Sequence, residues 1–144
     1  MSDPYDLNRF VAAQDGVYDA VCAELRSGAK RSHWMWFVFP QIAGLGHSAM
    51  AKKFAIASLR EAVAYLDHPL LGPRLRECTK LVLAVQNRSI NQIFGSPDDM
   101  KFGSSMTLFA QAAPDEVIFR DAIEKYHSGR FDGATLEILR ARRS

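Results

Sequence analysis

Residues 30–48 read KRSHWMWFVFPQIAGLGHS, an unusual density of aromatic, cationic and amide side chains. If Ser32 caps a short helix here, apolar side chains occupy nearly all of its faces. A helix that is apolar all round must be buried. Pro40 ends the helix, and Gly44 and Gly46 let the following loop adopt positive φ or approach another backbone closely. The stretch therefore predicts a buried central helix followed by a tight loop.

The pattern outside this stretch predicts an all-α fold. Apolar residues recur at helical spacing, and no period-two alternation of useful length occurs. Ser58 with Glu61, and Ser89 with Gln92, have the spacing of capping boxes. Turn signals divide the chain into about eight short helical segments, with no linker rich in Gly, Ser or Pro. We therefore expect a single all-α domain over residues 1–144 with little or no sheet.

Other helix boundaries are marked by single residues. Asp6 can cap a helix that starts at Leu7, and Ser48 can cap the helix after the glycine loop. Gly28 stands where a helix C-terminus favours a left-handed residue. Pro97 suits the first position of a further helix.

Composition excludes several classes of protein. Hydrophobic residues make up 48% of the 144 residues and charged residues 24%, which is typical of a folded globular domain and too apolar for a disordered inhibitor. The formal charge is only +2, and the one dense basic run is residues 140–143. A nucleic-acid binder usually carries a basic face or stripe, so we expect no nucleic-acid partner.

The cysteines and histidines predict no metal site. Cys22 and Cys78 form no C-x-x-C pair, and two unpaired thiols fit a reducing cytoplasm. His47, His68 and His127 lack the close spacing of metal ligands. We expect no metal and no cofactor.

The sequence also predicts a cytoplasmic protein without a membrane partner. The N-terminus, MSDPYDLNRF, is acidic and lacks the apolar stretch of a secretory signal. The longest strongly apolar run, residues 34–39, is far shorter than the roughly 20 residues that cross a bilayer. The sequence does not indicate an oligomeric state.

A second polar segment, FGSPDDMKFGSSMTLF, spans residues 94–109. Its three hydroxyls beside Lys101 could form a phosphate cradle or cap a helix that begins near Met106. Ser104 or Ser105 could be a nucleophile only with a base in contact, and His33 is the candidate base. No G-x-S-x-G elbow surrounds these serines.

The acidic pair in this segment also has two interpretations. Asp98 and Asp99 could act as an acid and a base, but adjacent acids at a helix start favour solvated capping residues.

The two segments together predict a small-molecule site where residues 30–48 meet residues 94–109, suited to a nucleotide or another phosphate-bearing compound. An aromatic wall would stack a planar group while polar side chains hold the rest. The candidate ligand-binding residues are Lys30, His33, Trp34, Trp36, Gln41, Gly44, Gly46, Ser48, Asp99, Lys101, Ser104, Ser105 and Thr107. No catalytic residue or reaction is indicated.

Two alternatives to this site remain. Exposed tryptophans on a convex surface would indicate a protein-interaction module, with the polar residues as its rim. Both segments could instead be purely structural, serving as core and helix caps.

Three stretches, HWMWFVFPQIAGLGHS, YLDHPLLGPRLREC and FGSPDDMKFGSSMTLF, resemble a family of small bacterial and fungal proteins catalogued as domain of unknown function 1810. The likeness runs from DLNRFVAAQ to TLEIL. It implies an all-α, stand-alone cytoplasmic protein without an established activity. Members are sometimes labelled calpastatin, but calpastatin-type inhibitors are disordered and polar, unlike this chain.

The family's signature positions, carried over by this resemblance, are His33, Trp34, Trp36, Phe39, Pro40, Gln41, Gly44, Gly46, Ser48, Asp99, Lys101, Ser104, Ser105, Met106, Thr107 and Phe109.

Overall fold

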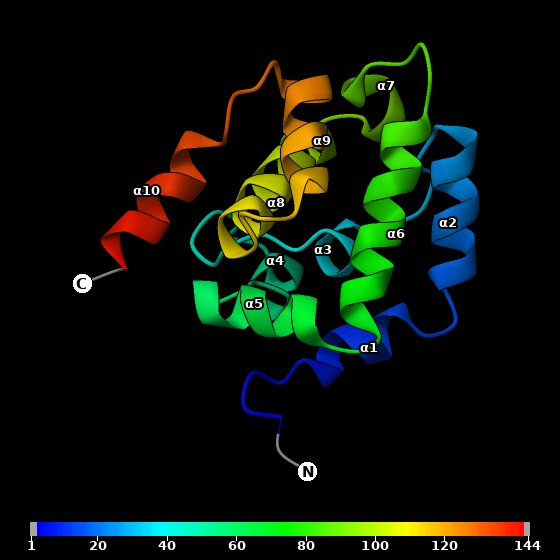
Figure 1. Cartoon of the computed structure of the whole chain (residues 1–144). Helices are drawn as coiled ribbons and strands as arrows, with labels where there is room; N and C mark the ends of the chain where they lie inside the picture. Colours follow the sequence, from blue (N-terminus) through cyan, green and yellow to red (C-terminus); the bar gives the residue numbers. More distant parts are fainter. Residues whose placement is uncertain (1–2, 143–144) are drawn as a thin grey trace.

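The computed structural model describes residues 3–142, which fold into ten α-helices around one hydrophobic core (Figure 1). The all-α expectation is confirmed, and the only extended pairing in the described residues is an isolated parallel bridge between Ile42 and Ile56. The helices are α1 (Asn8–Gln14), α2 (Tyr18–Ser27), α3 (Met35–Val38), α4 (Ala49–Lys53), α5 (Leu59–Asp67), α6 (Leu71–Ala84), α7 (Ile90–Phe94), α8 (Asp98–Ala112), α9 (Val117–His127) and α10 (Gly133–Ala141).

Helix α8 occupies the centre of the fold. Every residue from Phe102 to Ala110 is buried, and α8 contacts α5, α7, α9 and α10. A helix buried on all sides needs apolar or small side chains all round, which this segment supplies. The first turn of α8, which ends at Lys101, and its last two residues, Gln111 and Ala112, remain at least partly exposed.

The buried helix predicted within residues 30–48 is α3, and its burial is confirmed. Trp34, Met35 and Phe39 are each at most 2% exposed. The predicted Ser32 cap is wrong: the N-cap residue is Trp34, without a side-chain cap. Ser32 instead donates its hydroxyl to Glu24 on α2.

The predicted cap of α1 also differs. Asp6 has a left-handed φ of 52° and does not cap the helix. The carboxylate of Asp3 takes that role, accepting hydrogen bonds from the backbone N–H groups of Leu7 at 2.8 Å and Asn8 at 2.9 Å. These hydrogen bonds lower the pKa of Asp3.

The three serine caps are confirmed, one of them in part. Ser48 accepts from the backbone of α4, and Ser89 forms a complete capping box with Gln92. The Ser58 hydroxyl accepts from the Glu61 N–H at 3.1 Å, but the Glu61 carboxylate does not accept the hydrogen bond from the Ser58 N–H that would complete a capping box. It pairs instead with Arg9, at 2.9 Å.

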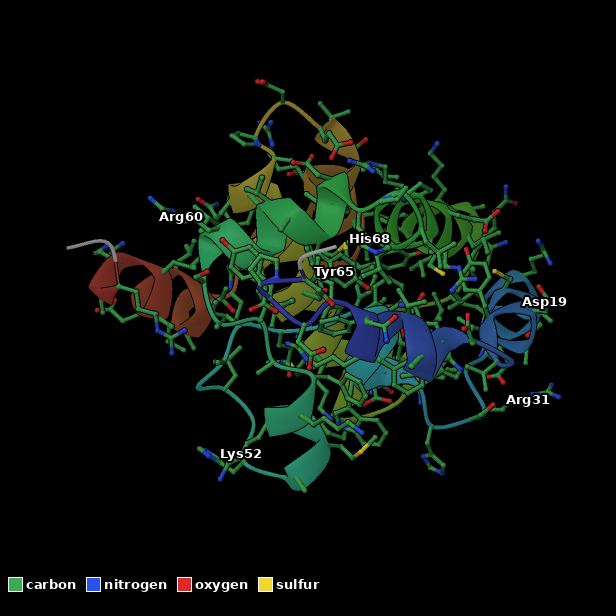
Figure 2. The ribbon with its side chains drawn as sticks, turned by 90° about the horizontal axis from the view of Figure 1, so that it is seen from below. Asp19, Arg31, Lys52, Arg60, Tyr65 and His68 are labelled. Carbon is green, nitrogen blue, oxygen red and sulfur yellow. The ribbon has the colours of Figure 1, made fainter. Side chains whose placement is uncertain are left out.

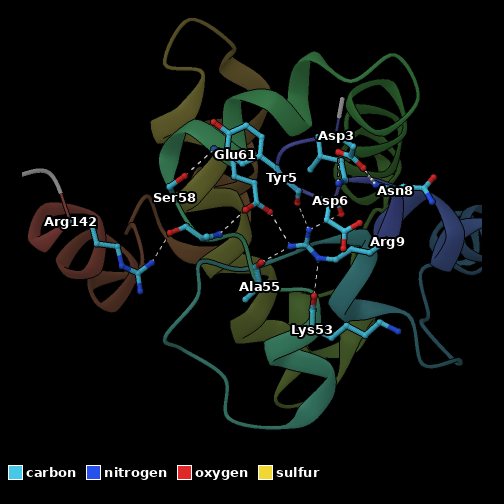
Figure 3. Close-up of polar contacts among 12 residues, drawn as sticks. Asp3, Tyr5, Asp6, Asn8, Arg9, Lys53, Ala55, Ser58, Glu61 and Arg142 are labelled. Carbon is cyan, nitrogen blue, oxygen red and sulfur yellow. Dashed lines mark hydrogen bonds and ion pairs between the residues drawn. The ribbon is translucent and has the colours of Figure 1, made fainter. Parts of the chain in front are cut away.

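Arg9 joins three parts of the chain (Figure 3). Its guanidinium binds Glu61, whose side chain is only 4% exposed. It also donates to the backbone carbonyls of Tyr5, Asp6, Lys53 and Ala55. The start of the chain is thereby tied to the end of α4 and the start of α5, which fixes residues 53–55.

Figure 2 shows the charged residues Asp19, Arg31 and Lys52 at the periphery, with Tyr65 further inside. Tyr65 is fully buried, and burial raises its pKa. Within residues 3–142, no helix combines the length and apolar character that a transmembrane span requires.

Candidate functional site

The two polar–aromatic segments meet in space. The Phe102 ring of α8 lies 5.1 Å from the Phe39 ring and 5.2 Å from the Phe94 ring, measured between centroids. Lys30 of the first segment also forms an ion pair with Asp98 of the second at 2.9 Å, and the Lys30 side chain is only 8% exposed. The convergence of residues 30–48 with the start of α8 therefore has both an apolar and an ionic part.

A cavity of about 230 Å³ opens beside this junction, and we call it the loop hollow. Its walls come from α3, the glycine loop, α4 and the first turn of α8. It is lined by Met35, Trp36, Phe39, Gln41, Ile42, Ala43, Gly44, Gly46, Ala51, Lys52, Phe54, Ala55 and Lys101.

A second cavity of about 310 Å³, the lysine hollow, adjoins the first. It is lined by Lys30, His33, Met35, Trp36, Ser96, Pro97, Asp98 and Lys101. The two hollows share Met35, Trp36 and Lys101. The Lys101 ammonium lies 5.5 Å from the centroid of the Trp36 ring. This cation–π pair therefore stands between the hollows.

The loop hollow carries an excess of positive charge. Lys52 and Lys101 line it, and no acidic side chain among the described residues does. In the lysine hollow the charge is more balanced, because Asp98 lies 2.9 Å from Lys30 and 3.6 Å from Lys101. Electrostatics therefore favour an anionic group in the loop hollow.

Two glycines give the loop hollow its shape. Gly44 has a φ of 109°, a conformation that other residues rarely adopt. A Cβ on Gly46 would lie 2.5 Å from the Cβ of Ala51, so only glycine lets the loop approach α4 this closely. The β-bridge between Ile42 and Ile56 also holds the loop, because the Ala43 and Ile56 N–H groups each donate a 2.8 Å hydrogen bond across it.

Glu24 positions the segment that precedes α3. Its carboxylate accepts from the backbone N–H groups of Arg31 and Ser32, from the Ser32 hydroxyl and from the Trp34 indole. Burial alone would raise the pKa of Glu24, but these hydrogen bonds outweigh it and lower the pKa to about 2. The segment that carries Lys30 and His33 is thus anchored to α2.

The structure brings seven of the thirteen candidate residues to the two hollows. Those that line the loop hollow are Trp36, Gln41, Gly44, Gly46 and Lys101, and those that line the lysine hollow are Lys30, His33, Trp36 and Lys101. The others lie outside both: Trp34, Ser48, Asp99, Ser104, Ser105 and Thr107. Trp34 is a core residue, 2% exposed, and Ser48 serves as the cap of α4.

The hydroxyls of α8 do not form a phosphate cradle. Ser104 and Thr107 donate to backbone carbonyls one turn earlier in the helix. Ser105 is fully buried, and its hydroxyl has no hydrogen-bond partner among the described residues. His33 is exposed whereas Ser105 is buried, so the two do not form the nucleophile and base pair that the sequence suggested. Asp99 accepts from Met100 N–H and from Asn91, as a helix-start residue.

Two charged lining residues, Lys52 and Asp98, were not among the candidates. Lys52 reaches the loop hollow from α4, and Asp98 binds both lysines of the lysine hollow. The sequence contains a signal for Lys52, because the predicted Ser48 cap starts a helix that continues through it directly after the glycine loop. For Asp98 the sequence suggests an acid–base pair with Asp99 or a solvated capping role, but not an ion pair with the two lysines.

The described residues contain no group of three or more His, Cys, Asp or Glu side chains placed to hold a metal ion. Cys22 and Cys78 are both free and buried. Burial raises the pKa of the Cys78 thiol, which disfavours the thiolate that would bind a metal or react.

Comparisons with known proteins bear on the family and the fold of the chain. The chain is similar to a conserved hypothetical protein, Rv1873, from Mycobacterium tuberculosis, whose crystal structure superimposes with a TM-score of 0.95 at 57% sequence identity, covering 96% of this chain and 99% of the other. A search of curated proteins finds no significant match. The model of the family described as protein of unknown function DUF1810 matches residues 4–139. The chain therefore belongs to the DUF1810 family.

Proposed function

We propose that the loop hollow binds a small anionic molecule with a planar group, such as a mononucleotide or another ring-bearing phosphate. The observation that carries the proposal is the combination of Lys52 and Lys101 with an apolar floor in one concave site without a lining acid. An anion would pair with the Lys52 ammonium and with the Lys101 ammonium, which also lies 3.6 Å from Asp98, and the Gln41 amide would supply a directional hydrogen bond.

The size of the loop hollow limits the ligand. Its volume, about 230 Å³, lies below the roughly 300–1,000 Å³ typical of drug-sized ligand sites. A single ring or a mononucleotide suits it better than a dinucleotide. A longer ligand would have to pass Trp36 and Lys101 into the lysine hollow.

The arrangement of the tryptophans favours this function over protein docking. A docking patch would need exposed aromatic rings on a convex surface. Trp34 is buried in the core, and the half-buried Trp36 lines two concave sites.

Isothermal titration with adenosine monophosphate tests the proposal, with adenosine and inorganic phosphate as separate probes of the planar and anionic parts. We expect Lys52→Ala and Lys101→Ala each to weaken binding of the monophosphate about 10-fold, the loss of one charge-assisted contact. Lys53→Ala is the matched control, because Lys53 neighbours Lys52 on α4 but does not line the hollow.

The proposal is refuted if neither adenosine monophosphate nor inorganic phosphate binds the wild-type protein. The proposal is also refuted if Lys52→Ala, Lys101→Ala and Lys53→Ala weaken binding equally, because that result would indicate nonspecific attraction of the anion. If the variants only lose stability and no ligand binds, the purely structural interpretation holds.

A further inference from the structure

A third hollow, of about 300 Å³, lies between α5 and α10, and we call it the arginine hollow. It is lined by Ser58, Leu59, Arg60, Gln111, Leu136, Leu139, Arg140 and Arg142. It shares no lining residue with the other two hollows. We propose that it binds an anionic amphiphile, a small molecule with one phosphate or carboxylate group and a short apolar chain. This inference is independent of the function proposed above.

The positive charge of the arginine hollow favours binding of an anion. Three arginines line it, and no acidic residue within the described part of the chain does. Arg60 has no hydrogen-bond or ion-pair partner among residues 3–142. Among the described side chains Arg140 pairs only with Glu137, at 3.2 Å, and both are more than 70% exposed, so solvent screens this pair. Both guanidinium groups can therefore offer the paired N–H donors that suit phosphate and carboxylate.

The leucines that line the arginine hollow favour binding of an apolar group. Leu136 and Leu139 stand one turn apart on α10 and line the hollow together with Leu59 of α5. All three are only partly buried, and Thr135 is the only residue of α10 that is fully buried. A short alkyl chain laid along these leucines would remove the remaining apolar surface from water.

Both ends of α10 are held by contacts that do not involve the guanidinium groups of Arg60 and Arg140. At its start, the Asp132 N–H donates to Thr107 of α8 at 2.8 Å. At its end, Arg142 donates to the carbonyl of Ala57 at 3.0 Å (Figure 3) and also to that of Ala43 at 2.9 Å. Figure 2 shows Arg60 at the end of α5 nearest α10. Contacts within the protein therefore hold the α10 wall of the hollow in place without a ligand.

Titration with octyl phosphate, followed by NMR of the leucine methyl groups, tests the proposal. We expect the methyl signals of Leu136 and Leu139 to shift, and octyl phosphate to bind at least about 10-fold more tightly than octanol or inorganic phosphate, because each of these lacks one half of the interaction. Arg60→Ala should weaken binding about 10-fold or more, and Arg60→Lys, which keeps the charge but loses the planar fork, by less.

Arg26→Ala is the control, because Arg26 is an exposed arginine on α2 that does not line the hollow. Arg60 is itself exposed, so thermal denaturation should show that its variants fold normally. The proposal is overturned if octyl phosphate fails to bind, if octanol or inorganic phosphate binds as tightly, or if Arg60→Ala binds like the wild type. Cosedimentation with vesicles of phosphatidylcholine and phosphatidic acid in equal parts, without binding of octyl phosphate, would also overturn it in favour of a membrane surface.

Discussion

Replacing Glu24 by glutamine should lower the free energy of unfolding at pH 7 by about 2 kcal/mol. The carboxylate accepts four hydrogen bonds from residues 31–34. Glutamine keeps the size and one acceptor oxygen, but it removes the charge and turns an NH₂ group toward donors. Hydrogen bonds to a charged group contribute about 1.5–3 kcal/mol each, and the retained oxygen and solvent screening reduce the net loss to about 2 kcal/mol.

The pH dependence of this loss makes the test specific. The pKa of Glu24 is about 2 in the folded protein, below its ordinary value of 4.5. A lowered pKa means that the carboxylate's contribution is complete above about pH 4.5 and disappears as the pH falls toward 2. In urea denaturation, the stability difference between wild type and Glu24→Gln should therefore be larger at pH 7 than at pH 3.

The exposed Glu137 provides the control, and Glu137→Gln should change stability by less than about 0.5 kcal/mol at either pH. A loss for Glu24→Gln that is equal at both pH values, or no loss at pH 7, would refute the role of the ionised carboxylate.

Three further substitutions test the packing of the fold. Arg9→Ala should cost about 3 kcal/mol in urea denaturation, because it leaves the buried Glu61 carboxylate without its partner; a loss below about 1 kcal/mol would contradict this. Gly103→Ala should cost about 1–3 kcal/mol by calorimetry, since a Cβ there would lie 2.9 Å from the His127 ring, and an unchanged Tm would argue against this contact. Leu75→Ala should cost about 2–5 kcal/mol, measured by circular dichroism, because Leu75 is 1% exposed in the core.

The fold could be predicted where local chemistry decides the structure. The capping box of Ser89 and Gln92 needs only residues three positions apart, and it forms as expected. Ser32 and Asp6 failed as caps for different physical reasons. A carboxylate distant in sequence, Glu24, takes the Ser32 hydroxyl, and the left-handed backbone of Asp6 leaves the capping role to Asp3. Such competition between partners is not visible in a local pattern.

The candidate site was predictable to a similar degree. Clustering of rare side chains identified Trp36, Gln41 and Lys101, which line the loop hollow. The same criterion also selected Ser105 and Thr107, because sequence density does not tell that this part of α8 is buried on all sides. The arginine hollow could not be predicted, since it forms only when α10 packs beside α5 and brings arginines from both helices to one cavity.

The indole N–H signals of the two tryptophans provide the most direct test of the loop hollow as a ligand site. Trp36 lines the hollow, whereas the buried Trp34 donates its indole N–H to Glu24 at 3.0 Å. On titration with adenosine monophosphate, we predict that the Trp36 indole signal and the Gly44 and Gly46 amide signals shift together along one saturating curve while the Trp34 signal stays in place. Saturating binding that leaves the Trp36, Gly44 and Gly46 signals unchanged would contradict the proposal.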